Sequence, residues 1–320
     1  MPFFLNVRVA RKASEADGIS SFELIDDAGK QLPAFSAGSH IDIVLGPGLI
    51  RQYSLCNNPA ETHRYVVAVL LETPGRGGSA AMHDRVKEGD LLQISMPKNH
   101  FPLARDATNN LLLAGGIGIT PILCMAEQLS ATGTDFELHY CTRSKARTAF
   151  RDRIAQAPFA DKVRLHFDDG DEEQKFQLTR RLAAPEIGTH LYVCGPTGFM
   201  TSVLDTARAS GWPSAQLHYE FFSADVAPQA ADQTFEVEVA SSSRVIVVQK
   251  DKTVLQALEE AGIKVDASCE QGVCGTCLTR VLAGVPDHRD HYLTPAEKAE
   301  NDKFTPCCSR SKSPRLVLDL

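Results

Sequence analysis

The sequence predicts a chain of several domains: an antiparallel β-barrel, an α/β domain with a parallel sheet, and a small α+β domain. Short β-rich runs fill the N-terminal part, strands and helices alternate from about residue 109, and the C-terminal part encloses a dense group of cysteines. A chain of 320 residues also exceeds the usual size of one hydrophobic core. We place the domains at residues 1–104, 105–224 and 234–320, with a linker at 225–233.

The N-terminal domain is expected to be a barrel because its strands are short, closely spaced and separated by turns rich in Gly, Pro and Asn. These runs are FFLNVRVA, SFELID, HIDIVL, RQYSLC, RYVVAVLL and DLLQISM.

The middle domain shows a different pattern, in which each apolar run is followed by a helical one. Such alternation is typical of a parallel sheet flanked by helices. The pairs are NLLLAG with TPILCMAEQLSATG, FELHYCTRS with TAFRDRIAQA, VRLHFDD with LTRRLAA, and THLYVCG with TGFMTSVLDTARASG.

The C-terminal domain follows a segment, residues 223–233, that is rich in Ala, Pro and polar residues and has no apolar periodicity. TFEVEVA and SRVIVVQK then predict a hairpin, and RLVLDL predicts a closing strand. Between them TVLQALEEAG has a helical period, with Thr253 as its N-cap and Gly262 as its stop.

Composition argues against two classes of partner. A net charge of −7 is unlike that of a nucleic-acid binder or a polybasic membrane anchor. The apolar stretch 111–129 is interrupted by glycines and a proline, so we interpret it as a buried strand, turn and helix. The N-terminus lacks the cleavage pattern of a secretory signal, and nine cysteines are an odd number. We therefore expect a cytoplasmic protein with reduced thiols and no disulfides.

The strongest motif is the cysteine pattern Cys269-x4-Cys274-x2-Cys277, followed much later by Cys307. This spacing is that of a plant-type [2Fe-2S] ferredoxin. Glycines within the loop allow its backbone to approach the cluster closely. The alternative, a structural zinc site, usually shows two C-x2-C pairs, whereas the second half here is the adjacent pair Cys307 and Cys308. We take Cys307 as the fourth ligand.

Two turns in the middle domain favour a dinucleotide. Gly115, Gly116 and Gly118 follow an apolar strand, with Thr120 placed to cap the next helix and Pro121 at its first position. A helix start of this kind offers N–H groups and a positive dipole end to a pyrophosphate. A glycine turn alone is also a structural device, and the full G-x-G-x-x-G pattern is absent. A second strand ends at Cys194, Gly195 and Pro196 and turns into another helix.

A third group of residues suits a flavin. Arg51, Tyr53 and Ser54 lie on an expected barrel strand, so that Tyr53 can lie along a flat ring and Ser54 can bond its edge. Gly77, Gly78 and Ser79 begin a short helix whose N–H groups can hold a phosphate, with Arg51 or Arg76 supplying charge. Taken singly, these residues are better explained by ordinary barrel packing of Tyr53, a plain loop and solvated arginines. A nicotinamide gives up a hydride and a [2Fe-2S] cluster takes single electrons, and a flavin does both.

Taken together and in this order, the three groups resemble the phthalate dioxygenase reductase family, the compact reductases of Rieske-type aromatic-ring oxygenases. The resemblance covers essentially the whole chain. It implies an FMN-binding, ferredoxin-reductase-like barrel, an NADH-binding domain and a β-grasp, plant-type ferredoxin domain. The motifs that carry it include AGGIGITPIL, CGP, CGTC, DHRD and the terminal LVLDL.

The resemblance also implies roles for matching positions. Ser54, Cys194 and Phe222 form the expected catalytic group, although the doubled Phe221-Phe222 leaves the choice of phenylalanine open. Arg143 could accept the 2′-phosphate of NADPH, whereas Asp168 and Asp169 could oppose it, and NADH is expected. The other expected cofactor contacts are Arg51, Tyr53, Gly75, Arg76, Gly77, Gly78, Ser79, Gly115, Gly116, Gly118, Thr120, Pro121, Gly195 and Pro196.

The expected activity is transfer of hydride from NADH to FMN, and of single electrons through the cluster to a separate Rieske-type oxygenase. Phthalate is the first aromatic carboxylate expected as that oxygenase's substrate and vanillate the second. Two alternatives stay open: a self-contained NADH oxidase or ferric reductase, and a ferredoxin fused to a degenerate sensor domain.

Overall fold

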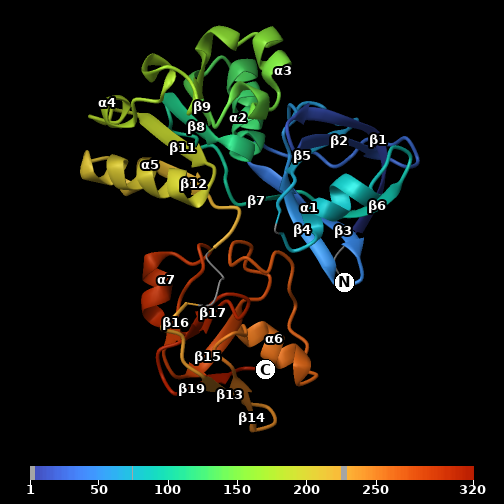
Figure 1. Cartoon of the computed structure of the whole chain (residues 1–320), viewed down its shortest axis with the longest axis vertical. Coiled ribbons are helices and arrows are strands. Elements are labelled where there is room, and N and C mark those ends of the chain that lie inside the picture. The colour runs from blue at the N-terminus through green and yellow to red at the C-terminus, as the bar shows by residue number, and fades with distance from the viewer. Residues whose placement is uncertain (1–3, 74, 225–228) are drawn as a thin grey trace. The chain divides into compact units, whose positions relative to one another are not determined.

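The computed structural model describes residues 4–73, 75–224 and 229–320. The chain forms two compact units, Met1–Glu220 and Phe221–Leu320. Figure 1 shows a barrel and a helix-flanked sheet in the first unit, and a smaller sheet with helices in the second. All three parts of the expected fold are therefore present. Part of the expected linker, residues 225–228, lies outside the described residues.

The barrel is a sheet with strand order β4-β3-β6-β1-β2-β5, in which β7 also pairs with β3. An isolated antiparallel bridge between Leu55, just after β4, and Val67 in β5 joins the two ends of this path. The strands are β1 Phe4–Ala16, β2 Ile19–Asp26, β3 Ser39–Gly46, β4 Leu49–Ser54, β5 Tyr65–Leu70, β6 Leu91–Ser95 and β7 Lys98–Asn99, and the short helices after β5 are α1 Gly78–Ala80 and the π-helix η1 Ala81–Arg85.

Alternation along the barrel strands fills the interior. Ile41 and Ile43 of β3 and Val7 of β1 are fully buried in one cluster with Phe22 and Ile94. Each such side chain contributes roughly 1.5–3 kcal/mol through removal from water. The barrel therefore has a core of its own.

The second part of this unit is a parallel sheet with strand order β10-β9-β8-β11-β12. The order reverses between β8 and β11, and ligands of doubly wound folds bind at such a switch point. The strands are β8 Asn109–Gly115, β9 Asp135–Thr142, β10 Val163–Phe167, β11 Thr189–Cys194 and β12 Leu217–Glu220. The α-helices are α2 Ile119–Thr132, α3 Arg151–Gln156, α4 Leu178–Arg181 and α5 Thr197–Ala209, with 3-10 helices at Gly116–Gly118, Lys145–Arg147, Ala160–Lys162, Glu172–Gln174 and Ser214–Gln216.

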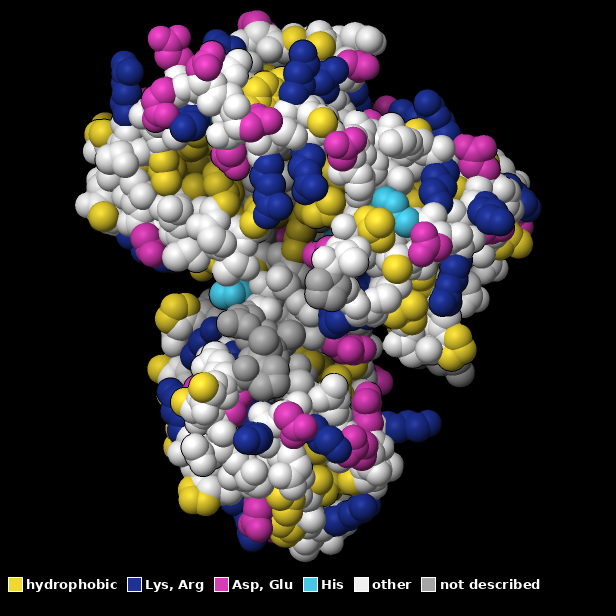
Figure 2. Space-filling model, viewed as in Figure 1, with side chains coloured by type: hydrophobic (Ala, Val, Ile, Leu, Met, Phe, Trp, Pro, Cys, Tyr) yellow, Lys and Arg dark blue, Asp and Glu magenta, His cyan; other side chains and the backbone are white. Residues whose placement is uncertain are grey.

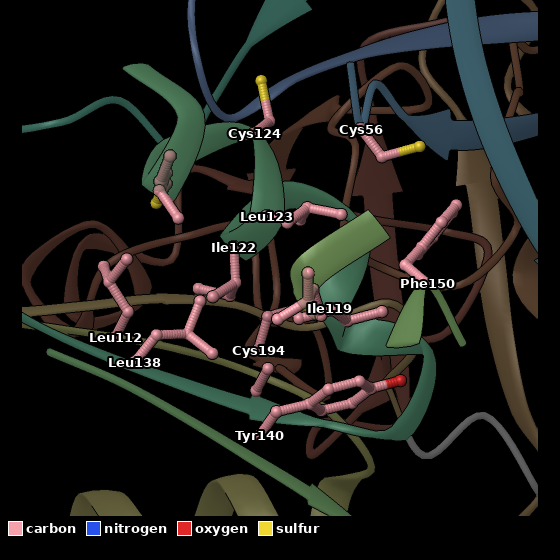
Figure 3. Packing of buried hydrophobic residues seen from close by; sticks show 14 of the residues in the cluster. Cys56, Leu112, Ile119, Ile122, Leu123, Cys124, Leu138, Tyr140, Phe150 and Cys194 are labelled. Carbon is pink, nitrogen blue, oxygen red and sulfur yellow. The ribbon is translucent and has the colours of Figure 1, made fainter. Parts of the chain in front are cut away.

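Helices α2 and α5 lie on opposite sides of this sheet (Figure 1). Helix α2 is apolar nearly all round because it packs between the sheet and the barrel. Figure 3 shows Ile122 beside Leu112 and Leu138 of the sheet, and the same cluster contains Ala37 and Phe101 from the N-terminal part. This double burial explains why residues 111–129 are so hydrophobic. Among the described residues, no helix combines the length and apolar character needed to cross a bilayer.

The second unit contains a sheet with strand order β14-β13-β19-β15-β17. The expected hairpin is confirmed by the antiparallel pairing of β13 with β14. Thr253 caps α6 with Gln256 in a capping box, as expected, and Gly262 follows with φ of 79°. The elements are β13 Phe235–Val239, β14 Arg244–Val248, α6 Val254–Glu260, β15 Thr279–Ala283, β16 Pro286–Asp287, α7 Pro295–Glu300, β17 Lys303–Phe304, β18 Arg310–Ser311 and β19 Arg315–Leu318.

The closing strand β19 takes a central place in this sheet. It runs parallel to β13 on one side and antiparallel to β15 on the other. Leu316 and Leu318 are fully buried in the core of the unit, together with Val237 and Phe304. The last strand of the chain is therefore the one that joins the hairpin to the rest of the sheet.

Candidate functional site

The expected flavin strand and the expected phosphate loop lie together in the structure. Arg51 on β4 donates from Nη2 to the backbone oxygen of Arg76 over 2.9 Å. Its side chain also covers Gly78 so closely that a Cβ there would lie 2.4 Å from Arg51 Cγ. Glycine at 78 is therefore what lets the guanidinium reach across the loop. These contacts bring together a strand and a loop that are far apart in sequence.

The loop itself is held in a turn that needs glycine. Gly77 has φ of 81°, a left-handed conformation that residues with a Cβ rarely adopt. A Cβ at Gly75 would lie 2.7 Å from the backbone oxygen of Glu72. Ser79 Oγ accepts a hydrogen bond from Glu72 N over 3.1 Å, which leaves the hydroxyl hydrogen available to another acceptor. The folded loop therefore already presents N–H and hydroxyl donors to a ligand.

Ser54 ends β4 and Glu220 ends β12, and the two side chains meet. Ser54 Oγ donates to Glu220 Oε2 over 3.4 Å. Burial raises the pKa of Glu220 to about 8, against the opposing effect of this hydrogen bond. Cys194, at the end of β11, lies opposite Glu220 in register. Burial first, and then the nearby Glu220 charge, raise the pKa of the Cys194 thiol, so that it stays neutral.

Sequence reasoning missed Glu220. The signal that could have found it is its place at the carboxyl end of a parallel strand, where ligand sites gather. The structure thus adds an acid to the expected group of Ser54 and Cys194.

The two expected nucleotide turns touch each other at the switch point between β8 and β11. A Cβ at Gly118 would lie 2.2 Å from the backbone oxygen of Cys194, and one at Gly195 would lie 2.9 Å from Gly115 Cα. Gly116 has φ of 53°. Phe199, which sequence reasoning missed, lies against both turns, since a Cβ at Gly115 would lie 2.8 Å from its ring. The glycines in these turns are therefore needed for close packing of the two backbones, whether or not a ligand is bound.

The helix start differs from expectation at Thr120 and Pro121. Helix α2 begins at Ile119 with Gly118 as N-cap, so the expected cap at Thr120 was wrong. The 3-10 turn Gly116–Gly118 runs directly into the helix and moves its start toward the N-terminus. Thr120 instead donates from Oγ1 to the Ile117 oxygen over 3.1 Å, and Pro121 is the third helical residue. A proline is still tolerated there, because the N–H groups of the first turn have no partner within the helix.

Arg143 follows β9 and is exposed, next to the acidic turn after β10. Its backbone oxygen accepts from Asp169 N over 3.2 Å, and Thr142 O accepts from Asp168 N over 3.0 Å. The cation and the two acids considered for nucleotide preference therefore lie at neighbouring strand ends.

The four expected cluster ligands form two thiol pairs. The thiols of Cys269 and Cys274 are hydrogen-bonded to each other, and so are those of Cys277 and Cys307. The hydrogen bond from Cys269 lowers the pKa of Cys274 to about 5. Further N–H groups point at the sulfurs, from Gln271 to Cys269 over 3.3 Å and from Thr276 to Cys274 over 3.5 Å. Two pairs of thiols surrounded by N–H donors fit a cluster with two irons.

The loop that carries these cysteines depends on left-handed backbone at Gly272 and Gly275, with φ of 67° and 70°. Gly275 also lies beneath the Tyr292 ring, where a Cβ would clash at 2.2 Å. Among the described residues, no group of three or more His, Cys, Asp or Glu side chains is placed closely enough to hold a metal ion.

A neighbouring cysteine, Cys308, is hydrogen-bonded to Cys307 through its side chain and also contacts two hydroxyl groups. Its Sγ lies 3.2 Å from Thr305 Oγ1 and 3.8 Å from Ser309 Oγ. It is also packed against Gly272, where a Cβ would lie 2.5 Å from Cys308 Sγ. Cys307, not Cys308, is the one of the two that also hydrogen-bonds to Cys277, so Cys307 stays the predicted fourth ligand.

The two phenylalanines that follow β12 have different surroundings. The Phe221 ring stacks on His291, whereas Phe222 is 37% exposed. Phe221 is thus engaged within the second unit, and Phe222 stays the predicted choice between the two phenylalanines.

The fold and these groups together define a class of protein: an iron–sulfur oxidoreductase with a nucleotide-binding domain. Residues 237–312 match the model of the 2Fe-2S iron-sulfur cluster binding domain. Residues 95–217 match the N-terminal domain model of the dimethylamine monooxygenase subunit DmmA-like family.

Full-length relatives give the family. The chain is 54% identical to a vanillate O-demethylase oxidoreductase of Pseudomonas sp. (strain HR199 / DSM 7063), over 95% of this chain and 96% of that one. It is 52% identical to the enzyme of the same name from Pseudomonas putida, over 98% of both chains. A solved structure of phthalate dioxygenase reductase, described as modular for electron transfer from pyridine nucleotides to [2Fe-2S], matches 99% of this chain and 98% of that one, with 39% identity and a TM-score of 0.79.

The chain belongs to the phthalate dioxygenase reductase family. The expected family, the three-part fold and the class of NADH-dependent flavin and iron–sulfur reductase are confirmed. The cofactors of this family, FMN, NADH and a [2Fe-2S] cluster, are the ones that the sequence predicts.

Proposed function

We propose that this chain is the reductase component of a vanillate O-demethylase-type system. It takes hydride from NADH onto FMN and passes single electrons through its cluster to a separate Rieske-type oxygenase. The observation that carries the proposal is the higher identity to vanillate-type reductases, 54% and 52%, than to phthalate dioxygenase reductase, 39%. Vanillate thus replaces phthalate, the first substrate expected from the sequence, as the preferred candidate.

The proposed flavin site consists of β4 and the loop of residues 75–79. A bound flavin supplies the exchange between one hydride and two single electrons. Arg51 and the N–H groups of the loop hold the FMN phosphate, since a guanidinium and oriented N–H groups form strong, charge-assisted bonds to it. Tyr53 lies along the ring. Ser54, Cys194 and Phe222 border the reacting part, and the Ser54–Glu220 pair holds a proton there.

The proposed NADH site is the pair of turns at the switch point. The Gly115–Gly118 turn faces a pyrophosphate with the N-terminal end of α2, a helix of 14 residues with a full dipole. Cys194, Gly195 and Pro196 border the nicotinamide side. Asp168 and Asp169 beside Arg143 oppose a 2′-phosphate, so NADH is favoured. A ratio of kcat/KM values in favour of NADPH would contradict this preference.

The proposed cluster ligands are Cys269, Cys274, Cys277 and Cys307, and the other cysteines stay reduced in the cytoplasm. We retain 1–104, 105–224 and 234–320 as the three functional domains. Residues 234–320 contain 11 Lys or Arg and 13 Asp or Glu, a net of −2. Figure 2 likewise shows both signs of charge interspersed. Docking of the oxygenase is therefore expected to depend weakly on salt.

The test begins with the purified chain. Its released cofactor is identified by mass, and its iron and acid-labile sulfide are measured. NADH oxidation is then coupled to separately purified vanillate and phthalate oxygenases. We expect FMN, equal amounts of iron and sulfide, and faster turnover of vanillate than of phthalate. Full NADH oxidation with ferric salts and no turnover by either oxygenase would instead favour a self-contained ferric reductase.

A further inference from the structure

The first residue of the second unit is attached to the loop region around the cluster ligands. Phe221 follows directly on β12, and its ring stacks on His291 with centroids 3.9 Å apart and planes inclined by 10°. His291 lies between β16 and α7. The stack therefore joins the start of the connection between the units to a loop far along the chain.

Two backbone hydrogen bonds extend this attachment to the cysteine loop. Ala224 N donates to Gln271 O over 2.8 Å, and His291 N donates to Gly272 O over 2.9 Å. Gly272 has little free space, since a Cβ there would lie 3.3 Å from Ala224 Cβ and 3.2 Å from Asp290 Cα. Three segments thus meet at Gly272, in the middle of the loop that carries three cysteines.

The loop that carries His291 is itself fixed. The Asp290 carboxylate is buried and accepts from Leu293 N over 2.7 Å. Arg289 forms an ion pair with Asp232, which is also buried, at the far end of the connection. The backbone around His291 is therefore fixed, so its ring can keep Phe221 in place.

The other side of the connection is fixed within the first unit. Glu220, the last residue of that unit, bonds to Ser54 on the barrel. Consecutive residues are thus tied to different units: Glu220 to the expected flavin edge and Phe221 to the cluster loop region. Little free chain remains between these two attachments.

We propose that His291 is a positioning residue for electron transfer from the flavin to the cluster. It acts through Phe221, by keeping the start of the connection packed on the cluster loop. This inference rests on the proposed function, because it assumes a flavin in the first unit and a cluster in the second. Electron transfer falls steeply with distance, and loss of this packing adds free chain between the flavin-bearing unit and the cluster-bearing unit.

The first test is amide hydrogen exchange of the full-length holoprotein. His291→Ala removes the ring partner of Phe221, and the exchange of the Ala224 amide is expected to rise roughly three- to tenfold, in keeping with the loss of one aromatic pair. His291→Phe keeps a flat ring and should restore protection. His63→Ala, at an exposed histidine of the first unit, is the matched control and should change nothing.

The second test separates the two electron-transfer steps by rapid mixing with NADH. In His291→Ala, bleaching of the flavin by NADH should keep its rate, and the reduced cluster should keep its electron paramagnetic resonance spectrum. Reduction of the cluster should slow by roughly three- to tenfold. Phe221→Leu should have the same effect, and the double variant should be no slower than either single variant, because both changes remove one contact.

Unchanged Ala224 exchange in His291→Ala, or an unchanged rate of cluster reduction in both single variants, would overturn the inference. Additive slowing in the double variant would also count against it. If the unaltered protein contained no flavin or reduced no cluster, the proposed function would fail instead. The exchange measurement would still report on the stack.

Discussion

Ser54 Oγ donates a hydrogen bond to Glu220 Oε2 over 3.4 Å, although the two residues are 166 positions apart. The bond joins the end of barrel strand β4 to the end of β12 in the parallel sheet. It brings the reactive edges of the two domains of the first unit together at a carboxyl group that is held mostly protonated near neutral pH.

The first prediction concerns the pH dependence of stability. Burial raises the pKa of Glu220 from its ordinary 4.5 to about 8. The stabilisation from the protonated carboxyl is therefore complete below pH 4.5 and is lost as the pH rises through 8. We expect the free energy of unfolding of the unaltered protein to fall by on the order of 4 kcal/mol more than that of Glu220→Gln between pH 5 and pH 9. Urea unfolding at both pH values measures this.

Glu173→Gln provides the comparison, since Glu173 is an exposed carboxylate of the same unit. It should leave the pH profile unchanged. A Glu220→Gln profile parallel to that of the unaltered protein would show that the carboxyl group is ionised throughout.

The second prediction concerns the glycine turn at the switch point. Gly118→Ala places a Cβ 2.2 Å from the backbone oxygen of Cys194, so the two nucleotide turns must separate. We expect a loss of about 2–4 kcal/mol in the free energy of unfolding and a higher KM for NADH. Gly198→Ala, in the first turn of α5 where a Cβ meets nothing within 4 Å, should be neutral or slightly stabilising. Equal stability of the two variants would contradict the close contact.

The third prediction concerns the phosphate end of the flavin. Arg51→Lys keeps a positive charge but loses the planar fork that reaches Arg76 O across Gly78. We expect the dissociation constant for FMN to rise about tenfold, measured by the fluorescence of released flavin, with no change in the spectrum of the cluster. Arg208→Lys on the exposed face of α5 should leave FMN affinity as it is. Unaltered affinity in Arg51→Lys would place the phosphate elsewhere.

The fourth prediction separates two adjacent cysteines. Cys307 hydrogen-bonds to both Cys277 and Cys308, whereas Cys308 also contacts Thr305 and packs on Gly272. Cys307→Ser should lose most of its iron and acid-labile sulfide, and Cys308→Ser should keep both, because serine preserves the bond to Thr305. Metal analysis and the visible spectrum measure the outcome. The reverse pattern would make Cys308 the ligand.

Local chemistry explains what could be predicted from the sequence. The cysteine spacing of a cluster loop is set by the cluster itself, so Cys269, Cys274 and Cys277 are readable from the chain alone. The same holds for α6, where Thr253 and Gln256 satisfy each other's backbone within one turn. Features that depend on a few neighbouring residues can therefore be predicted from the sequence.

Other features depend on contacts between distant segments. Glu220 and Phe199 acquire their roles only when β12 and α5 meet the barrel strand and the glycine turn. Thr120 was the expected N-cap because its hydroxyl group can cap a helix, whereas Gly118 has no side chain to do so. The helix starts earlier because the 3-10 turn Gly116–Gly118 runs directly into it. Asp232 looked like part of a polar linker, yet Arg289 makes it a buried ion-pair partner.

The central place of β19 constrains the order in which the protein matures. Its residues 315–318 must leave the ribosome before the sheet of the second unit can be completed between β13 and β15. By then about a hundred residues have followed the first unit out, at roughly 5–20 residues per second. The flavin-accepting half can thus assemble during translation before residues 315–318 complete the sheet of the second unit.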